Sequence, residues 1–79
     1  MNREVVRNQK GGGILAETLQ ITLAAARVNA GLTQSDVAEK MHVGKQTIVN
    51  WEKGKVKPPF ASLDFMARLY SIPIDNIRL

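Results

Sequence analysis

The side chains best suited to chemistry in this chain gather in one short segment, residues 45–57. The segment holds four lysines and one acidic residue, a local charge of +3 within a whole-chain charge of +4. Gln46, Thr47 and Asn50 add side chains that can hydrogen-bond to a ligand. Such a concentration of positive charge indicates a defined footprint for an anionic partner rather than a uniformly solvated surface.

The remaining composition argues against catalysis. The 79-residue chain has no cysteine, seven acidic residues scattered along it, and a single histidine, His42. These residues offer no thiolate, no zinc cluster and no Ser-His-Asp set, and His42 is interpreted as a turn residue. We therefore expect a non-enzymatic module that binds no metal ion and no cofactor.

Length and hydropathy limit the architecture further. A chain of 79 residues forms one small domain with a modest core, too small for a barrel or a doubly wound sheet. No apolar run approaches the ~18 residues of a membrane span, and the polar N-terminus does not resemble a secretory signal. The sequence predicts a soluble cytoplasmic protein with no membrane partner.

The chain divides into a polar arm and a helical domain. Residues 1–13 include three basic residues and three consecutive glycines, a composition that predicts a flexible arm. Residues 14–79 show helical periodicity and no alternating β pattern, so we expect an all-α domain of five short helices. The first four helices are predicted at about residues 15–29, about 33–41, 45–53 and about 60–70. The second begins within residues 32–34, and the short fifth helix has Pro73 in its first turn.

Local signals mark the helix ends and the core. Gly31 and Gly54 are expected to end the first and third helices, and Thr33 is expected to cap the second together with Asp36. The inward positions predicted on the last three long helices are Val37, Ala38, Met41, Ile48, Trp51, Phe60, Leu63, Met66, Ala67 and Tyr70.

The second and third helices form a unit of about twenty residues with the break at residues 42–44. Ala38 is small enough for the next helix to cross close above it, and Val43 and Ile48 would fill the angle between the two helices. This is the arrangement of a helix-turn-helix, whose second helix lies in the DNA major groove while the first crosses the backbone.

The same residues resemble the Xre/Cro and phage-repressor helix-turn-helix family. The resemblance covers about residues 19–77 without gaps. It implies a five-helix, lambda-repressor-like domain that acts, in the nucleoid, as a sequence-specific transcriptional regulator and most simply as a repressor. It rests on Gly31-Leu32-Thr33-Gln34, Val37-Ala38, Thr47-Ile48, Trp51-Glu52-Lys53-Gly54-Lys55, Pro58 and Ile72-x-Ile74-Asp75-x-Ile77.

The resemblance also implies roles for individual residues. Base contacts fall to the exposed face of the helix at 45–53, since lysine can reach guanine, glutamine and asparagine can bond adenine, and valine can touch a thymine methyl. The implied base contacts are Lys45, Gln46, Thr47, Val49 and Asn50. The implied phosphate contacts are Gln34, Lys53, Lys55 and Lys57. Arg27 and Glu52 are assigned to a largely buried structural ion pair.

Two positions depart from the family pattern. His42 stands where the family usually has glycine, and Gly44 stands where a serine or threonine usually caps the recognition helix. Gly44 is the weaker cap and offers no hydroxyl to a phosphate. These departures concern the start of the recognition helix rather than the fold.

One recognition helix reads only about four or five base pairs, so we expect a weak homodimer across two half-sites. The candidate dimer surface is the C-terminal segment with Ile72, Pro73, Ile74, Ile77 and Leu79. Alternatively, the three isoleucines cover their own core and leave Leu79 exposed.

Protein partners remain as alternatives to DNA. The fold could serve an antitoxin that binds a toxin and represses its own operon, or an adaptor that does not bind DNA. Asp36 and Glu39 could also contact RNA polymerase in an activator. A protein-binding role would predict a sizeable exposed apolar patch outside the dimer surface, whereas an adaptor would not need the lysines of residues 45–57.

Overall fold

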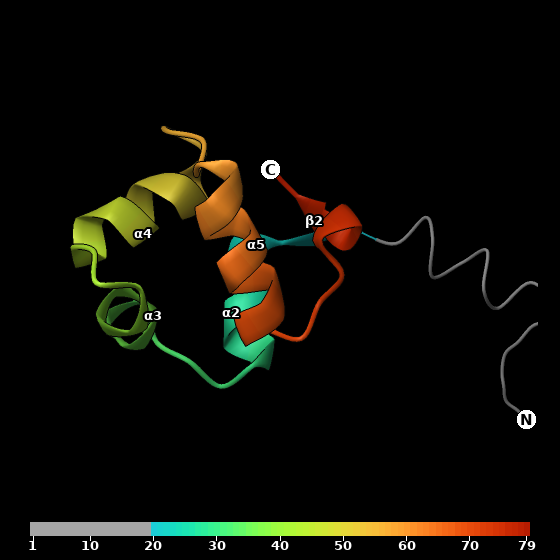
Figure 1. The fold of residues 1–79 in the computed structure, drawn as a ribbon, viewed down its shortest axis with the longest axis horizontal. Coiled ribbons are helices and arrows are strands. Elements are labelled where there is room, and N and C mark those ends of the chain that lie inside the picture. The colour runs from blue at the N-terminus through green and yellow to red at the C-terminus, as the bar shows by residue number, and fades with distance from the viewer. Residues whose placement is uncertain (1–19) are drawn as a thin grey trace, which may run out of the picture.

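The computed structural model describes residues 20–79; the predicted arm and the start of the first predicted helix lie outside the described residues. This part of the chain contains four α-helices, one 3-10 turn and a two-stranded sheet (Figure 1). In chain order the elements are β1 (Ile21–Thr22), α2 (Leu23–Asn29), α3 (Gln34–Met41), α4 (Lys45–Lys53), α5 (Phe60–Leu69), η1 (Ile74–Asn76) and β2 (Ile77–Arg78).

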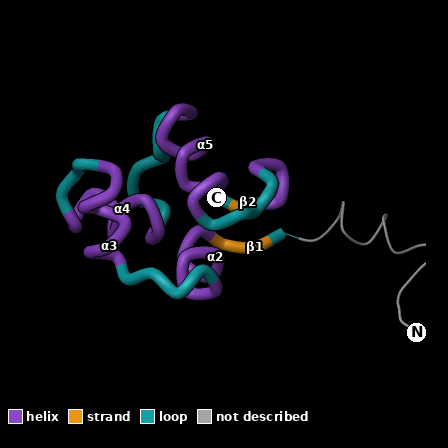
Figure 2. Tube along the Cα trace, turned by 60° about the horizontal axis from the view of Figure 1, so that its bottom comes forward, coloured by secondary structure: helices purple, strands orange, loops and turns teal. Residues whose placement is uncertain are grey.

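The helix-turn-helix pair occupies one end of the described part. Figures 1 and 2 show α3 and α4 together at that end, the sheet and η1 at the other, and α2 and α5 between them. The ten residues of the core come from all four helices, from β2 and from Tyr70, which directly follows α5. They are Leu23, Ala26, Val37, Ala38, Ile48, Trp51, Met66, Ala67, Tyr70 and Ile77. Because Val37 and Ile48 are completely buried, the angle between α3 and α4 is fixed by packing.

Each of the four helices ends in the same hydrogen-bonding pattern. A residue with left-handed backbone follows the helix, and its N–H and the next N–H bond back to carbonyls in the last turn, as in a Schellman motif. The left-handed residues are Gly31, His42, Gly54 and Ser71, with φ of 77°, 59°, 78° and 58°. His42 therefore occupies the position where the family usually has glycine, in the backbone conformation that favours glycine.

The start of α3 carries the predicted cap. The Thr33 hydroxyl accepts the Asp36 N–H at 3.0 Å, and the Asp36 carboxylate accepts the Thr33 N–H at 2.8 Å. This reciprocal pair is a capping box. Gly44 makes no side-chain hydrogen bond at the start of α4.

The prediction of one helix over about residues 15–29 is wrong at residues 21 and 22. Residues 21 and 22 are extended, and α2 begins at Leu23, where the Thr22 hydroxyl accepts the Ala25 N–H at 3.1 Å. β1 pairs in parallel with β2, with Ile21 opposite Ile77 and Thr22 opposite Arg78. The β-branched side chains of Ile21 and Thr22 suit this pairing. The expectation of no β structure is corrected accordingly.

Two further expectations need correction. The predicted fifth helix is a single 3-10 turn, Ile74–Asn76, so the described residues do not show five α-helices. Phe60 was predicted to be buried, but it is 74% exposed. The buried face of α5 consists of Met66, Ala67 and the following Tyr70, and Phe60 lies at the first residue of the helix, beyond that face.

Candidate nucleic-acid interface

The outer face of α4 presents polar and basic side chains. Lys45 and Gln46 are exposed, while Thr47, Val49 and Asn50 are half-buried. The Gln46 side-chain amide donates to the Asn50 side-chain oxygen at 3.0 Å, as residues four apart on one helix face can. This bond leaves the Gln46 oxygen and the Asn50 amide nitrogen without a partner among the described residues. An acceptor and a donor are thus held side by side on the surface.

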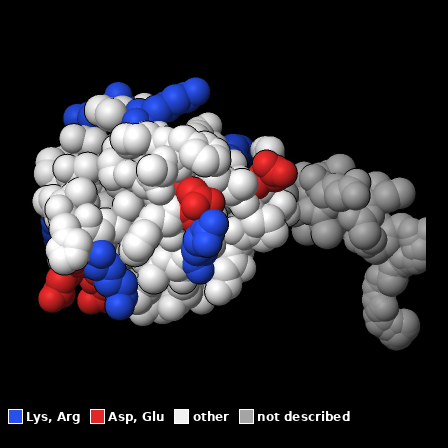
Figure 3. Space-filling view, viewed as in Figure 1, with Lys and Arg blue, Asp and Glu red and all other residues white. Residues whose placement is uncertain are grey.

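The lysines that follow form a basic surface. Lys53, Lys55 and Lys57 are exposed, and Figure 3 shows Lys and Arg side chains along the edge of the molecule that carries α4 and the loop after it. The Asp and Glu side chains visible in that view lie elsewhere. The only acid of residues 45–57, Glu52, is 7% exposed and points inward. The positive charge of the segment is therefore not offset at its surface.

Arg27 and Glu52 join α2 to α4. The Arg27 guanidinium donates to the two Glu52 carboxylate oxygens, from Nε at 2.7 Å and from Nη2 at 3.2 Å. Its Nη1 donates to the Leu32 carbonyl at 2.9 Å, in the loop before α3. The hydrogen bond to Glu52 raises the pKa of Arg27 above its already high ordinary value. One partly buried cation thus holds α2, α4 and the approach to α3 together.

Gln34, the implied phosphate contact, is part of the same network. Its side-chain amide donates to Glu52 Oε1 at 2.9 Å, and the residue is half-buried. This bond uses one of the two amide hydrogens and leaves the other for a ligand. This contact leaves no signal in the sequence, because Gln34 and Glu52 lie 18 positions apart and a glutamine at a helix start does not indicate an internal partner.

A carboxylate lies at the same end of α3. Hydrogen bonds from the Thr33 backbone N–H and hydroxyl lower the pKa of Asp36, a half-buried residue. Asp36 is therefore anionic at neutral pH, and its charge opposes a phosphate at this helix end. The lysines after α4 face no such opposition.

The C-terminal segment mostly packs on its own core. Ile77 is 8% exposed, and Ile72 and Ile74 are half-buried against the core, whereas Pro73 and Leu79 are exposed. A mainly apolar hollow of about 330 Å³ lies beside β1, lined by Gln20, Ile21, Ile72, Pro73 and Asn76. Of the five candidate dimer residues, Ile77 thus has the least surface to offer a second copy.

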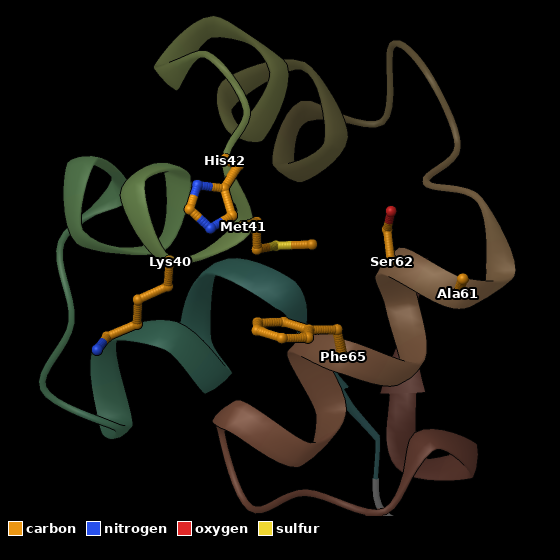
Figure 4. A pocket seen from close by; sticks show the side chains of 6 residues that line it. All are labelled: Lys40, Met41, His42, Ala61, Ser62 and Phe65. Carbon is orange, nitrogen blue, oxygen red and sulfur yellow. The ribbon is translucent and has the colours of Figure 1, made fainter.

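His42 lines a groove between the end of α3 and the first half of α5. The groove has a volume of about 250 Å³ and is lined by Lys40, Met41, His42, Ala61, Ser62 and Phe65. Figure 4 shows Met41 and Phe65 pointing toward each other across it. Within residues 20–79, no three His, Cys, Asp or Glu side chains gather as a metal site would require, and no helix is long and apolar enough to cross a membrane.

Curated relatives share the region that forms these helices. The chain is 34% identical over 55 residues to the HTH-type transcriptional activator BcrR of Enterococcus faecalis. The aligned region covers 70% of this chain and 27% of that protein. It is 38% identical over 51 residues to the cryptic phage CTXphi transcriptional repressor RstR of Vibrio cholerae. Here the aligned region covers 65% of this chain and 46% of the repressor. An uncharacterized HTH-type transcriptional regulator of Methanocaldococcus jannaschii, MJ0272, is 39% identical over 46 residues, covering 58% and 70%.

The chain therefore spans less than half the length of the activator and of the phage repressor. No solved structure is significantly similar to it. The helix-turn-helix family matches residues 23–77, from the first residue of α2 to the first residue of β2. Since that match covers most of the sequence, the chain belongs to the Xre/Cro-type helix-turn-helix family, a non-enzymatic family of DNA-binding regulators.

Proposed function

We propose that this chain binds double-stranded DNA sequence-specifically and regulates transcription, with α4 in the major groove of an operator. One observation carries the proposal: the outer face of α4 and the loop after it present lysines and amides, while the only acid of the segment is turned inward. An adaptor that binds only proteins would have no use for this arrangement.

The base contacts are proposed for Lys45, Gln46, Thr47, Val49 and Asn50. Adenine offers an acceptor and a donor side by side in the major groove, and the bonded Gln46–Asn50 pair holds a donor and an acceptor side by side as well. Lys45 can bond guanine, Thr47 suits several bases, and Val49 can contact a thymine methyl. The Gln46–Asn50 pair enters this contact already ordered, which lowers the entropy lost on binding.

The phosphate contacts are proposed for Gln34, Lys53, Lys55 and Lys57. The three lysines are exposed and can each neutralise a phosphate. Gln34 can use its second amide hydrogen together with the backbone N–H groups at the start of α3. Because Asp36 is anionic at that helix end, we expect the lysines to supply most of the salt-dependent affinity.

We further propose that the protein is a repressor and binds as a weak homodimer. Repression needs only an occupied operator that excludes RNA polymerase, whereas activation also needs a surface for polymerase. Paired recognition helices would read two half-sites about one helical turn apart. Pro73, Leu79 and the hollow beside β1 are the parts of the candidate dimer surface that remain available to a second copy.

Selection of bound duplexes from a random DNA pool at two salt concentrations tests the proposal. We expect enrichment of an inverted repeat. Gln46→Ala should then cost about 1–3 kcal/mol on the selected site and relax the preference at one position. Its matched control, Lys55→Ala, should weaken binding to all sequences alike and lower the salt slope by about one.

Two results would contradict this division of roles. Binding without enrichment would reduce the function to charge-driven attachment, and identical behaviour of the two variants would remove the distinction between base and phosphate contacts. If no DNA is retained even at low salt, an antitoxin or adaptor role replaces the proposal.

A further inference from the structure

The loop between α4 and α5 and the first residue of α5 expose apolar side chains beside the lysines. Val56 is 52% exposed and Phe60 is 74% exposed, the largest exposure among the large apolar side chains of the described residues. Lys55 precedes Val56, and Lys57 lies between Val56 and Phe60, both lysines exposed. A segment whose lysines served only solubility would not need an exposed phenylalanine directly after it.

The backbone of this loop is held rigidly. Gly54 ends α4 in left-handed conformation, and the Lys55 N–H donates to the Asn50 carbonyl at 3.0 Å. Two prolines follow, and the first, Pro58, is buried. Because each proline fixes its own φ and Pro58 anchors the chain, Val56 and Phe60 are presented in a nearly fixed arrangement. Binding a ligand there would cost little additional ordering.

We infer that Val56 and Phe60 pack against the deoxyribose rings of the DNA strand whose phosphates Lys55 and Lys57 bind. This inference rests on the proposed function. A DNA backbone alternates charged phosphates with apolar sugar faces. Lys55, Val56 and Lys57 alternate charged and apolar side chains in the same way, and Phe60 follows two prolines later. A contact of this kind adds affinity that is independent of sequence and of salt, whereas lysine–phosphate contacts lose affinity as salt rises.

The charge around the loop disfavours a second copy as the occupant. In a twofold dimer the same patch meets itself, so Lys55 and Lys57 of one copy would face those of the other. Like charges placed together in an interface are unfavourable. Figure 3 shows no acidic side chain along this edge of the molecule that could offset them. A DNA duplex offers phosphates to the lysines and apolar sugar faces to Val56 and Phe60.

Phe60→Ala tests the inference through DNA affinity at several salt concentrations. Since Phe60 is mostly exposed at the first residue of α5, the variant should keep the wild-type midpoint of unfolding. We expect affinity to fall about 5- to 30-fold, as for burial of part of a phenyl ring. The loss should be equal on selected and unrelated duplexes, with the salt slope unchanged. Val28→Ala, a similarly exposed apolar position on α2 (61%), is the matched control and should bind as wild type.

The other outcomes separate this contact from the proposed function. If Phe60→Ala binds as wild type while Lys55→Ala is weakened, the sugar contact is refuted and the DNA-binding function stands. A loss confined to the selected site would indicate insertion between bases, and a loss of self-association without DNA would indicate a contact between copies. Either result overturns the inference. If the wild-type protein binds no duplex, both fail.

Discussion

Removing the Glu52 carboxylate is the change whose consequence the structure defines best. Glu52 accepts hydrogen bonds from Arg27 Nε, Arg27 Nη2 and Gln34 Nε2, at 2.7, 3.2 and 2.9 Å. The side chains of Arg27 and Glu52 are 14% and 7% exposed. Glu52→Ala therefore leaves a guanidinium nearly out of contact with water, with the Leu32 carbonyl as its one remaining partner among the described residues.

The expected loss of stability is large for a domain of this size. Breaking a buried ion pair by removing one partner costs about 3–5 kcal/mol. Arg27 cannot escape this cost by losing its proton, because arginine stays charged throughout the accessible pH range. A domain of roughly 60 residues has a free energy of unfolding of about 3–9 kcal/mol. Glu52→Ala should therefore bring the protein close to unfolding at room temperature.

Urea unfolding followed by the fluorescence of Trp51, the only tryptophan, measures this loss. Trp51 is 8% exposed in the core, so its emission should shift on unfolding. The urea concentration at the midpoint should fall, while the slope of the free energy of unfolding against urea concentration should stay unchanged. Arg27→Met/Glu52→Met is the matched control: because it removes both charges and keeps apolar volume, it should lie much closer to wild type than the single variant.

Either of two results would contradict this role of the Glu52 carboxylate. A loss below about 1 kcal/mol for Glu52→Ala would mean that the pair behaves like an exposed salt bridge. A double variant as unstable as the single one would mean that the carboxylate acts through something other than the charge of Arg27.

Three further predictions concern single residues. His42→Gly should raise the free energy of unfolding by about 0.5–1 kcal/mol, because it removes left-handed strain of about 1–2 kcal/mol and adds chain entropy of about 0.5–1 kcal/mol to the unfolded state; an unchanged urea midpoint would contradict this. Burial raises the pKa of Tyr70 to about 12 from 10.0, so stability should be lost as pH rises from 10 to 12, where the unfolded state ionises first. The free energy of unfolding of Tyr70→Phe, measured over the same pH range, should lack the part of this fall that comes from tyrosine ionisation. The pKa of Asp36 lies below its ordinary 3.8, so the stability difference between wild type and Asp36→Ala should be full above that pH and vanish as acid protonates the folded carboxyl; a difference that persists in strong acid would refute the role of its charge.

The parts of the fold that local signals determine could be predicted from sequence. The bounds of α4 follow from Gly44 and Gly54 on either side of it, and the start of α3 follows from its Thr33–Asp36 capping box. Each of these signals acts within about one helical turn, so no knowledge of the remaining chain is needed.

The errors arise where distant residues decide the outcome. Ile21 lies in a stretch with helical spacing, but its pairing with Ile77 makes it a strand. Phe60 fits the apolar spacing of α5, yet burial depends on which neighbours surround the first residue of that helix. Neither the pairing of Ile21 nor the exposure of Phe60 can be read from the spacing of apolar residues along the chain, because both are properties of the packed domain.

The same limit applies to the candidate site. Arg27 and Glu52 were paired through the family resemblance, because 25 positions separate them. The Gln34–Glu52 hydrogen bond carried no such signal. The inward position of Glu52, the one acid of residues 45–57, was likewise expected only through the resemblance.

The partly buried network of Arg27, Glu52 and Gln34 therefore links stability to the proposed DNA contacts. Arg27 fixes the Leu32 carbonyl before α3, and Glu52 fixes Gln34 at its start. Glu52 itself belongs to α4, whose outer face carries the proposed base contacts. Its carboxylate thus sets the position of the start of α3 relative to the recognition helix. A DNA duplex has a fixed spacing between its phosphates and its base edges, so a loosened network should lower affinity before the domain unfolds, whereas loss of an exposed lysine lowers affinity alone.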